Sequence, residues 1–120
     1  MAGRARGPRP GEDDRPAKDP VDDLLAARLR ALAHPVRLAL LRACMARERS
    51  AGELVEIVIL SPAAVSEHLK VLRKTRLLVL EVRHRYHLYR ADPEVVREIV
   101  AALEALTEGR GLGGEGGAAG

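Results

Sequence analysis

The sequence predicts a mainly α-helical domain that carries one small β-hairpin, in the order α-α-α-α-β-β-α, and three observations support this fold class. The 120 residues include only two aromatic residues, Tyr86 and Tyr89, so a core must be built from Leu, Val, Ile and Ala, which favours helices packed through aliphatic side chains. Proline follows a capping residue at four places, and each of these suits the first turn of a helix. Between residues 77 and 89 the pattern changes to short β-rich runs.

The length and composition indicate one folded unit. A chain of 120 residues is near the usual single-domain size, and 47% hydrophobic with 31% charged residues is typical of a globular protein. We expect the folded domain over 19–108, a disordered arm over 1–18 and a disordered glycine-rich tail over 109–120. We expect neither a membrane span nor a secretory signal. The single cysteine, Cys44, excludes an intrachain disulfide and favours the cytoplasm.

Five helices are predicted, and capping residues mark where they start. Ser50 and Glu53 have the spacing of a capping box, in which each side chain accepts a hydrogen bond from the other residue's backbone N–H. The capping residues that precede proline occur in Asp19-Pro20, His34-Pro35, Ser61-Pro62 and Asp92-Pro93. The predicted helices span about 20–33, 35–46, 51–58, 62–74 and 93–106.

A β-hairpin is predicted between the fourth and fifth helices. The runs 77–82 and 86–89 are rich in leucine, valine and tyrosine, and the short segment 83–85 separates them. The turn lacks Asn-Gly and Asp-Gly, although His84 tolerates a positive φ better than most residues. The sequence therefore predicts the hairpin but leaves its register open.

The positive charge of the chain is concentrated in one stretch. Residues 68–90 contain seven Lys and Arg residues and a single acid, Glu81, for a net charge of +6, which leaves −3 for the rest of a chain whose total is +3. Such segregation is typical of a protein that binds a polyanion, and the alternative is a solvated charged surface.

The fourth helix carries the pattern that points most directly to function. Val65, Leu69 and Leu72 fall on one side at helical spacing, which predicts a buried seam, whereas small and cationic residues fall on the other side. Only residues 59–61 join the third helix to the fourth, and two short helices with a tight connection are typical of a helix-turn-helix. The alternative is an amphipathic helix with a solvated side.

A helix-turn-helix of this kind predicts two sets of contacts with double-stranded DNA. Short side chains near the start of the fourth helix allow close approach to base edges, while cations farther along the helix and in the hairpin reach phosphates. The residues expected in the major groove are Ser61, Ala63, Ser66, Glu67 and Lys70, and those expected on the DNA backbone are Arg73, Lys74, Arg83, His84 and Arg85.

Three motifs together resemble the ArsR/SmtB family of bacterial winged-helix transcriptional repressors. Residues 29–38 (LRALAHPVRL) resemble the start of that family's second helix, residues 61–72 (SPAAVSEHLKVL) its recognition helix, and residues 89–92 the end of its wing. The resemblance covers about residues 24–106 and implies a winged helix-turn-helix fold. It also implies a homodimer that binds an inverted-repeat operator, with the first and last helices forming the interface. The interface residues implied in this chain are Leu24, Leu25, Leu29, Val96, Ile99, Val100 and Leu103.

This chain departs from the family pattern at its turns. Ile59, Arg76 and His84 stand where the family usually has glycine, and Glu67 stands where it often has arginine. A left-handed conformation would strain the β-branched Ile59. We therefore expect the turns to be rebuilt or DNA binding to be weakened. Weakened binding would suit a degenerate winged helix that serves as a protein-interaction module.

Neither a metal site nor a catalytic site is predicted. The third helix has no cysteine and the last helix has no histidine, so both metal sites of the resembled family are missing, and no cofactor is expected. Cys44 is predicted to be inert core, and no phosphate loop or catalytic grouping suggests an enzyme. The remaining alternative is a repressor that responds to metal or oxidation through an unfamiliar site, with His84 and His87 as candidate metal ligands and Cys44 as the candidate thiol. No inducer is evident from the sequence.

Overall fold

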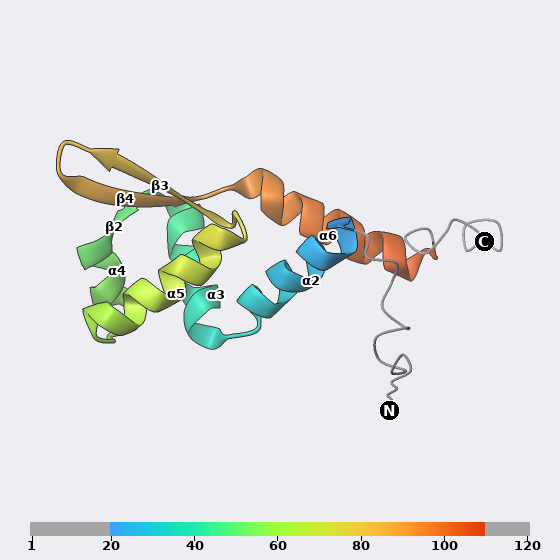
Figure 1. The fold of residues 1–120 in the computed structure, drawn as a ribbon, viewed down its shortest axis with the longest axis horizontal. Helices are drawn as coiled ribbons and strands as arrows, with labels where there is room; N and C mark the ends of the chain where they lie inside the picture. The colour runs from blue at the N-terminus through green and yellow to red at the C-terminus, as the bar shows by residue number, and fades with distance from the viewer. Residues whose placement is uncertain (1–19, 110–120) are drawn as a thin grey trace, which may run out of the picture.

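The computed structural model describes residues 20–109, which form five helices and a three-stranded antiparallel sheet (Figure 1). The elements in chain order are α2 (Pro20–Leu32), α3 (Pro35–Ala46), β2 (Arg49–Ser50), α4 (Ala51–Val58), α5 (Pro62–Lys74), β3 (Leu78–Arg83), β4 (Tyr86–Ala91) and α6 (Pro93–Thr107). The five predicted helices and the hairpin are thus all present. The arm predicted over 1–18, and all but the first residue of the tail predicted over 109–120, lie outside the described residues.

The predicted caps form at the helix starts that the structure describes. Ser50 Oγ accepts from the Glu53 N–H at 3.2 Å, and Glu53 Oε1 accepts from the Ser50 N–H at 2.8 Å, which completes the capping box of α4. Asp92 Oδ1 accepts from the Glu94 N–H at 3.0 Å at the start of α6. At the start of α3 the capping group is the ring of His34, whose Nδ1 accepts from the Val36 N–H at 3.1 Å. These bonds satisfy backbone donors that have no partner within the helix.

The sheet contains one strand that the sequence pattern did not predict. The strand order is β2-β4-β3, and the hairpin register pairs Arg83 with Tyr86 and Leu78 with Ala91. The second hairpin strand therefore continues to Ala91, two residues beyond the predicted end at residue 89. β2 is only two residues long, and Arg49 pairs with Tyr89. The backbone of β2 is extended because Ser50 is the N-cap of α4, and this N-cap has an extended conformation. Pairing with β4 gives the backbone N–H and C=O groups of β2 hydrogen-bond partners.

The core is aliphatic, as the scarcity of aromatic residues predicted. Its most completely buried large side chains come from α3, α4, α5, the start of β3 and the residue before it, namely Leu40, Leu54, Leu72, Leu77 and Leu78. Tyr89 of β4 is the one tyrosine in this core, whereas Tyr86 is exposed. The core thus fixes α4, α5 and the sheet to α3.

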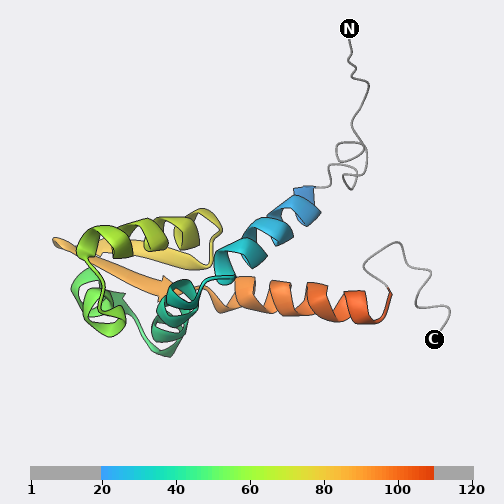
Figure 2. The ribbon, with the colours of Figure 1, turned by 90° about the horizontal axis from the view of Figure 1, so that it is seen from below.

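The two helices at the ends of the domain project away from the hairpin. Figures 1 and 2 both place α2 and α6 at one end of the molecule and the hairpin tip at the other, with α4 and α5 on the hairpin side. Among the described residues, no helix combines the length and apolar character needed to cross a membrane.

All three residues that stand in place of the family's glycines adopt the left-handed conformation. Their φ angles are 56° at Ile59, 67° at Arg76 and 59° at His84, and no other non-glycine residue among the described ones has a positive φ. The expectation of rebuilt turns is therefore wrong. The reason is visible at Arg76. Leu77 N–H donates to Leu72 O and Arg76 N–H donates to Arg73 O, both at 3.0 Å, which is the Schellman ending of a helix with arginine in the glycine position.

Candidate nucleic-acid interface

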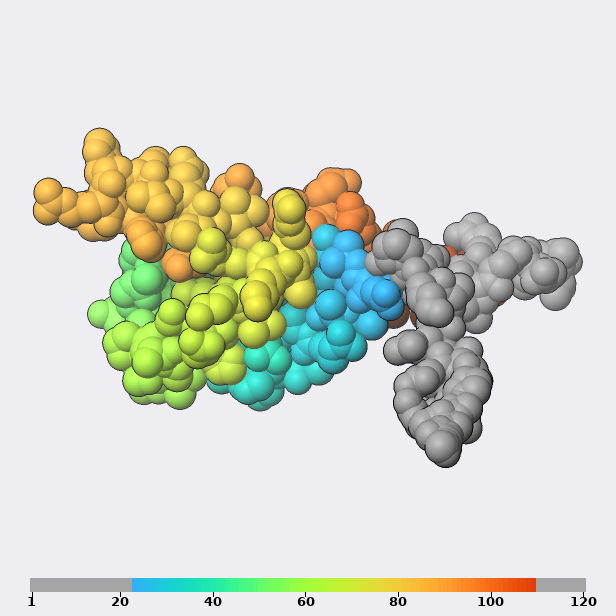
Figure 3. All heavy atoms as spheres, in the orientation of Figure 1, coloured from blue at the N-terminus to red at the C-terminus, as the bar shows by residue number. Residues whose placement is uncertain are grey.

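α5 has one buried side and one open side. Val65, Leu69 and Leu72 are buried in the core, as the helical spacing predicted. The opposite side is exposed along its whole length and carries Ala63, Ser66, Glu67, Lys70, Arg73 and Lys74. In Figure 3, α5 (yellow-green) lies on the face toward the viewer, below the gold hairpin that projects beyond it. A straight polar helix surface is therefore open to a large partner.

Short side chains occupy the first turns of this open side. Ser61 is the N-cap of α5, and its Oγ accepts from the Ala64 N–H at 3.1 Å, so this hydroxyl also holds the helix start in place. Pro62 follows as the first helical residue. With Ala63 and Ser66 exposed beyond it, the helix backbone at this end is accessible to a close-approaching surface.

The middle of the open side carries an ion pair. Lys70 Nζ lies 3.4 Å from Glu67 Oε2, one helical turn apart, and both side chains are exposed. Exposed pairs of this kind are worth only ~0.2–1 kcal/mol. The pair nevertheless places an anion and a cation side by side on the surface expected to meet DNA, so Glu67 partly neutralises Lys70.

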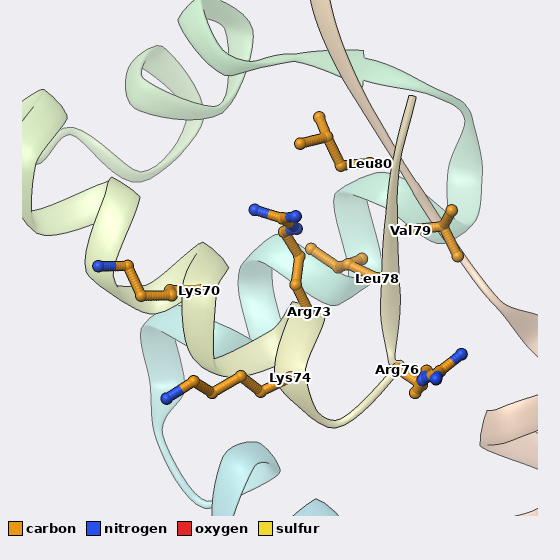
Figure 4. A pocket seen from close by; sticks show the side chains of 7 residues that line it. All are labelled: Lys70, Arg73, Lys74, Arg76, Leu78, Val79 and Leu80. Atoms are coloured by element: carbon orange, nitrogen blue, oxygen red, sulfur yellow. The ribbon is translucent and has the colours of Figure 1, made fainter. Parts of the chain in front are cut away.

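The end of α5 carries a cluster of cations beside β3. Lys70, Arg73, Lys74 and Arg76 line a hollow of about 390 Å³ together with Leu78, Val79 and Leu80 (Figure 4). Arg73 extends into the space between α5 and β3, whereas Lys74 and Arg76 extend to opposite sides in this view. Within the described part of the chain, Arg73, Lys74 and Arg76 form no ion pair. This cluster is the most cationic part of the interface.

Arg76 belongs to this cluster but was not among the predicted contacts. In the sequence, Arg76 stands out only in the positive charge of residues 68–90 and among the positions where the family usually has glycine. Its left-handed backbone sits directly after α5, which places it with the cations of the last turn. The concentration of positive charge over residues 68–90 is the feature of the sequence that could have predicted Arg76 as a contact.

Arg83 is in a different situation from the other predicted wing contacts. It is paired with Glu48, which precedes β2, and its Nε lies 3.4 Å from Glu81 Oε2. The hydrogen bond and charge of Glu48 raise the pKa of Arg83 above its usual value. His84 and Arg85 are exposed at the turn and have no ion pair among the described residues. The unneutralised charge of the wing tip is therefore that of Arg85.

A pair of histidines connects α5 to the start of α3. His68 of α5 and His34 have ring centroids 4.5 Å apart, and Arg37 Nη1 lies 3.3 Å from His68 Nδ1. Because a guanidinium only donates, Nδ1 of His68 must carry a lone pair, which fixes the neutral form of the ring. Desolvation first, and then the charges of His34 and Arg37, lower the pKa of His68. This cluster attaches the middle of α5 to the start of α3.

The helices α2 and α6 display apolar side chains that the protomer does not cover. Leu24 of α2 and Val100, Leu103 and Leu106 of α6 are exposed. Of the other residues expected at a dimer interface, Leu25, Leu29 and Val96 are half-buried, while Ile99 lies within the protomer's own core. An apolar surface of this kind at one end of a domain is typical of an interaction site.

No group of three or more His, Cys, Asp or Glu side chains among the described residues is arranged to hold a metal ion. Cys44 is buried on α3, and burial raises the pKa of its thiol to about 11. A thiol of that kind is protonated at neutral pH and reacts slowly with oxidants. His84 and His87 are both exposed on the hairpin.

Comparisons with known proteins agree on one family. The family model described as "Bacterial regulatory protein, arsR family" matches residues 34–78. The HTH-type transcriptional regulator YgaV of Escherichia coli (strain K12) is 39% identical over 82 residues, which cover 66% of this chain and 81% of that protein. Several solved structures are similar in fold, and two of them illustrate the similarity. NolR from Sinorhizobium fredii matches with a TM-score of 0.63 and 31% identity over 76% of this chain and 91% of its own. The transcriptional repressor BigR from Xylella fastidiosa matches with a TM-score of 0.58 and 26% identity over 69% and 86%.

Proposed function

The chain belongs to the ArsR family of bacterial regulatory proteins, and from that premise we propose that it represses transcription as a homodimer bound to an inverted-repeat operator. Family membership makes it a DNA-binding helix-turn-helix regulator of transcription, and its fold is the predicted winged helix. The description of BigR as a repressor supports repression here. A regulator that covers its operator blocks access to the promoter, and we place this action in the cytoplasm.

The observation that carries the proposal is the open side of α5. α5 enters the major groove with its first turns, where Ser61, Ala63 and Ser66 allow close approach to base edges. Ser66 is suited to donate to or accept from a base, and Ala63 to contact a thymine methyl group. Glu67 and Lys70 lie next along the helix, where Lys70 reaches guanine or phosphate once it leaves Glu67.

The phosphate contacts come from the unpaired cations. These cations lie in two places next to the open side of α5. The first group is at the end of α5, namely Arg73, Lys74 and Arg76, and the second is at the hairpin turn (the wing tip), namely His84 and Arg85. Arg83 contributes less than a free arginine because Glu48 and Glu81 neutralise it. Contacts of this kind set the position on the duplex and do not specify sequence.

The second copy is proposed to pair through the apolar surfaces of α2 and α6. Leu24, Val100 and Leu103 are exposed large hydrophobic side chains, and a symmetric dimer would remove them from water. Leu25, Leu29 and Val96 border this surface, while Ile99 supports it from the core. A two-fold axis through these helices would present two α5 helices to major grooves about 34 Å apart, which explains the preference for an inverted repeat.

Two arginines provide a matched test of DNA binding. The fluorescence anisotropy of a labelled duplex from the region upstream of the protein's own gene is measured against protein concentration at several salt concentrations. Arg73→Ala is expected to weaken binding and to lower the salt slope by about two for a dimer, one phosphate contact for each subunit. Arg42→Ala, which removes an exposed arginine from α3, is expected to change neither.

Three results would each contradict a part of the proposal. Absence of binding to this duplex at low salt would favour a winged helix that serves as a protein-interaction module. Equal salt slopes for Arg73→Ala and the wild type would show that the phosphate contacts are misassigned. Sedimentation of the free protein tests the dimer separately, and a monomer at micromolar concentration would exclude the proposed pairing.

A further inference from the structure

A second hollow lies between α4, the first turns of α5 and β4. Its volume is about 440 Å³, within the range of small-molecule sites in proteins. Figures 1 and 2 both show these three elements gathered at the hairpin end of the domain, away from the free ends of α2 and α6. The hollow is therefore separate from the proposed dimer surface and from the cation cluster at the end of α5.

The walls of this hollow are mainly apolar. Val55 of α4 and Val65 and Leu69 of α5 line it, and Val65 and Leu69 are core residues. Gly52 lines it from the first turn of α4, and a Cβ added there would meet only Ser50 Oγ, at the ordinary contact distance of 3.9 Å. A side chain at this position at the edge of the hollow therefore has room for its Cβ.

Among the residues that line the hollow, one that carries a polar group is buried. Tyr89 lines the hollow and is only 8% exposed, and its hydroxyl makes no hydrogen bond to any residue between 20 and 109 that the structure describes. Buried tyrosine hydroxyls are normally hydrogen-bonded, because leaving such a group unsatisfied costs free energy. A ligand that fills the hollow and carries a hydrogen-bonding group would satisfy it.

We propose that this hollow binds a small, uncharged, mainly apolar organic molecule with one hydroxyl or carbonyl group, which bonds to the Tyr89 hydroxyl. The apolar walls disfavour any charged ligand because its charge would lose hydration there. Glu56 and His87, both exposed, also line the hollow and form its polar edge. The volume admits a molecule of one or two rings, and Val55, Val65 and Leu69 provide its apolar contacts.

This ligand would act on DNA binding through α5. Ser66 lines the hollow and is also one of the residues assigned to the major groove, and Pro62 at the start of α5 lines the hollow as well. A ligand bound against these residues competes with close approach of the duplex. Coupling between two binding equilibria is reciprocal, so DNA must weaken ligand binding by the same factor. This regulatory step rests on the proposed function, whereas binding of the ligand does not.

The binding site is tested on the free protein with 2-naphthol, an uncharged two-ring alcohol. The chain contains no tryptophan, so naphthol fluorescence can be followed directly in a titration. Saturable one-to-one binding to each wild-type chain is expected. Tyr89→Phe removes only the hydroxyl and is expected to weaken binding about three- to tenfold. Gly52→Leu is expected to abolish binding, and Gly52→Ala is expected to retain it.

Each contrary result overturns a defined part of the inference. No saturable binding to the wild type, or equal binding to the wild type and Gly52→Leu, would overturn the site. Equal affinities for Tyr89→Phe and the wild type would overturn the role of the hydroxyl. Circular dichroism of the variants shows whether they are folded, and Gly52→Ala reports the effect of substitution alone.

The regulatory step is tested by repeating the duplex titration with 2-naphthol present. Weaker DNA binding is expected for the wild type and Gly52→Ala, and unchanged binding for Gly52→Leu. Unchanged wild-type affinity for DNA at saturating naphthol would overturn the regulation and leave the site intact. Failure of every variant to bind the duplex without naphthol would instead contradict the proposed function, and the titration of the free protein would be unaffected by that failure.

Discussion

The buried guanidinium of Arg28 on α2 donates from Nε to the backbone carbonyl oxygen of Thr75, 3.0 Å away at the end of α5. Its Nη1 donates to Glu98 Oε1 on α6, also at 3.0 Å. Thr75 in turn donates its hydroxyl proton to the last turn of α5, where Val71 O and Leu72 O lie within hydrogen-bond distance. One side chain thus joins the helix assigned to the DNA groove to both helices assigned to the dimer.

Replacement of Arg28 by methionine should therefore destabilise the domain. The substitution keeps a long side chain but leaves the Thr75 carbonyl without its donor, and hydrogen bonds that involve a charged group contribute about 1.5–3 kcal/mol. We expect Arg28→Met to lower the free energy of unfolding by about 2–3 kcal/mol in urea denaturation at one fixed protein concentration. Arg30→Met, at an exposed position on the same helix, is the control and should change it by less than about 0.5 kcal/mol. Equal effects of the two substitutions would refute the structural role of Arg28.

Removal of the Glu67 charge should strengthen DNA binding. Glu67→Gln releases Lys70 from its ion pair and takes an anion away from the phosphates, so we expect the affinity of the dimer for its operator to rise about three- to tenfold at low salt. Glu94→Gln is a matched control because it breaks an exposed pair with Arg97 at the same spacing on α6. Duplex anisotropy measures both. A weaker affinity for Glu67→Gln would mean that Glu67 itself accepts a hydrogen bond from a base.

The elements of this fold were predictable because their signals are local. The capping box at Ser50, the Xaa-Pro starts and the apolar seam of α5 each lie within one or two turns of chain, and local hydrogen bonds or helical spacing explain them. β2 gave no such signal, because two residues cannot show a strand period and its pairing with Tyr89 joins distant segments. The helical spacing that predicted the buried side of α5 also predicted its exposed side.

The parts of the site that could not be predicted depend on contacts between distant segments. Arg83 meets Glu48 from 35 positions away in the chain, so nothing near the hairpin indicated that its charge would be neutralised. Arg28 meets Thr75 from 47 positions away. Ile59 differs in kind: its β-branched side chain predicts strain in a left-handed conformation, but the residue that ends α4 adopts that conformation nevertheless.

Glycine at position 59 should stabilise the domain. Ile59 has φ 56° and ψ 54° and is 84% exposed, so its side chain adds strain and little burial. A left-handed conformation costs an L-residue roughly 1–2 kcal/mol, and the greater freedom of glycine in the unfolded chain offsets part of the gain. We expect Ile59→Gly to raise the free energy of unfolding by about 1 kcal/mol in urea denaturation. Ile57→Gly, two residues earlier in helical backbone, should lower it by about 1 kcal/mol or more. A loss of stability in Ile59→Gly would show that the isoleucine side chain makes a favourable contribution after all.

Stability should fall between pH 7.5 and 5.5 because of His68. Its pKa in the folded protein lies below the usual 6.5, chiefly through desolvation and then through the charges of His34 and Arg37, while Glu67 acts in the opposite direction. The unfolded chain therefore takes up this proton first as the pH falls. The stability is fully present above about pH 7 and decreases as the pH drops through 6.5 toward the lower folded pKa. Protonation of Nδ1 would also break the 3.3 Å contact with Arg37 and loosen α5 from α3.

Urea denaturation at pH 7.5 and pH 5.5 measures this effect, since the window lies above the range in which most carboxylates titrate. The wild type and His87→Gln, which replaces an exposed histidine on β4, are expected to lose the same free energy of unfolding between the two pH values. His68→Gln is expected to lose clearly less, although its stability at pH 7.5 is lower because the contact with Arg37 is gone. If His68→Gln loses as much as the wild type, some other group controls the response to acid. If the wild type becomes more stable at pH 5.5, the sign of the His68 effect is wrong.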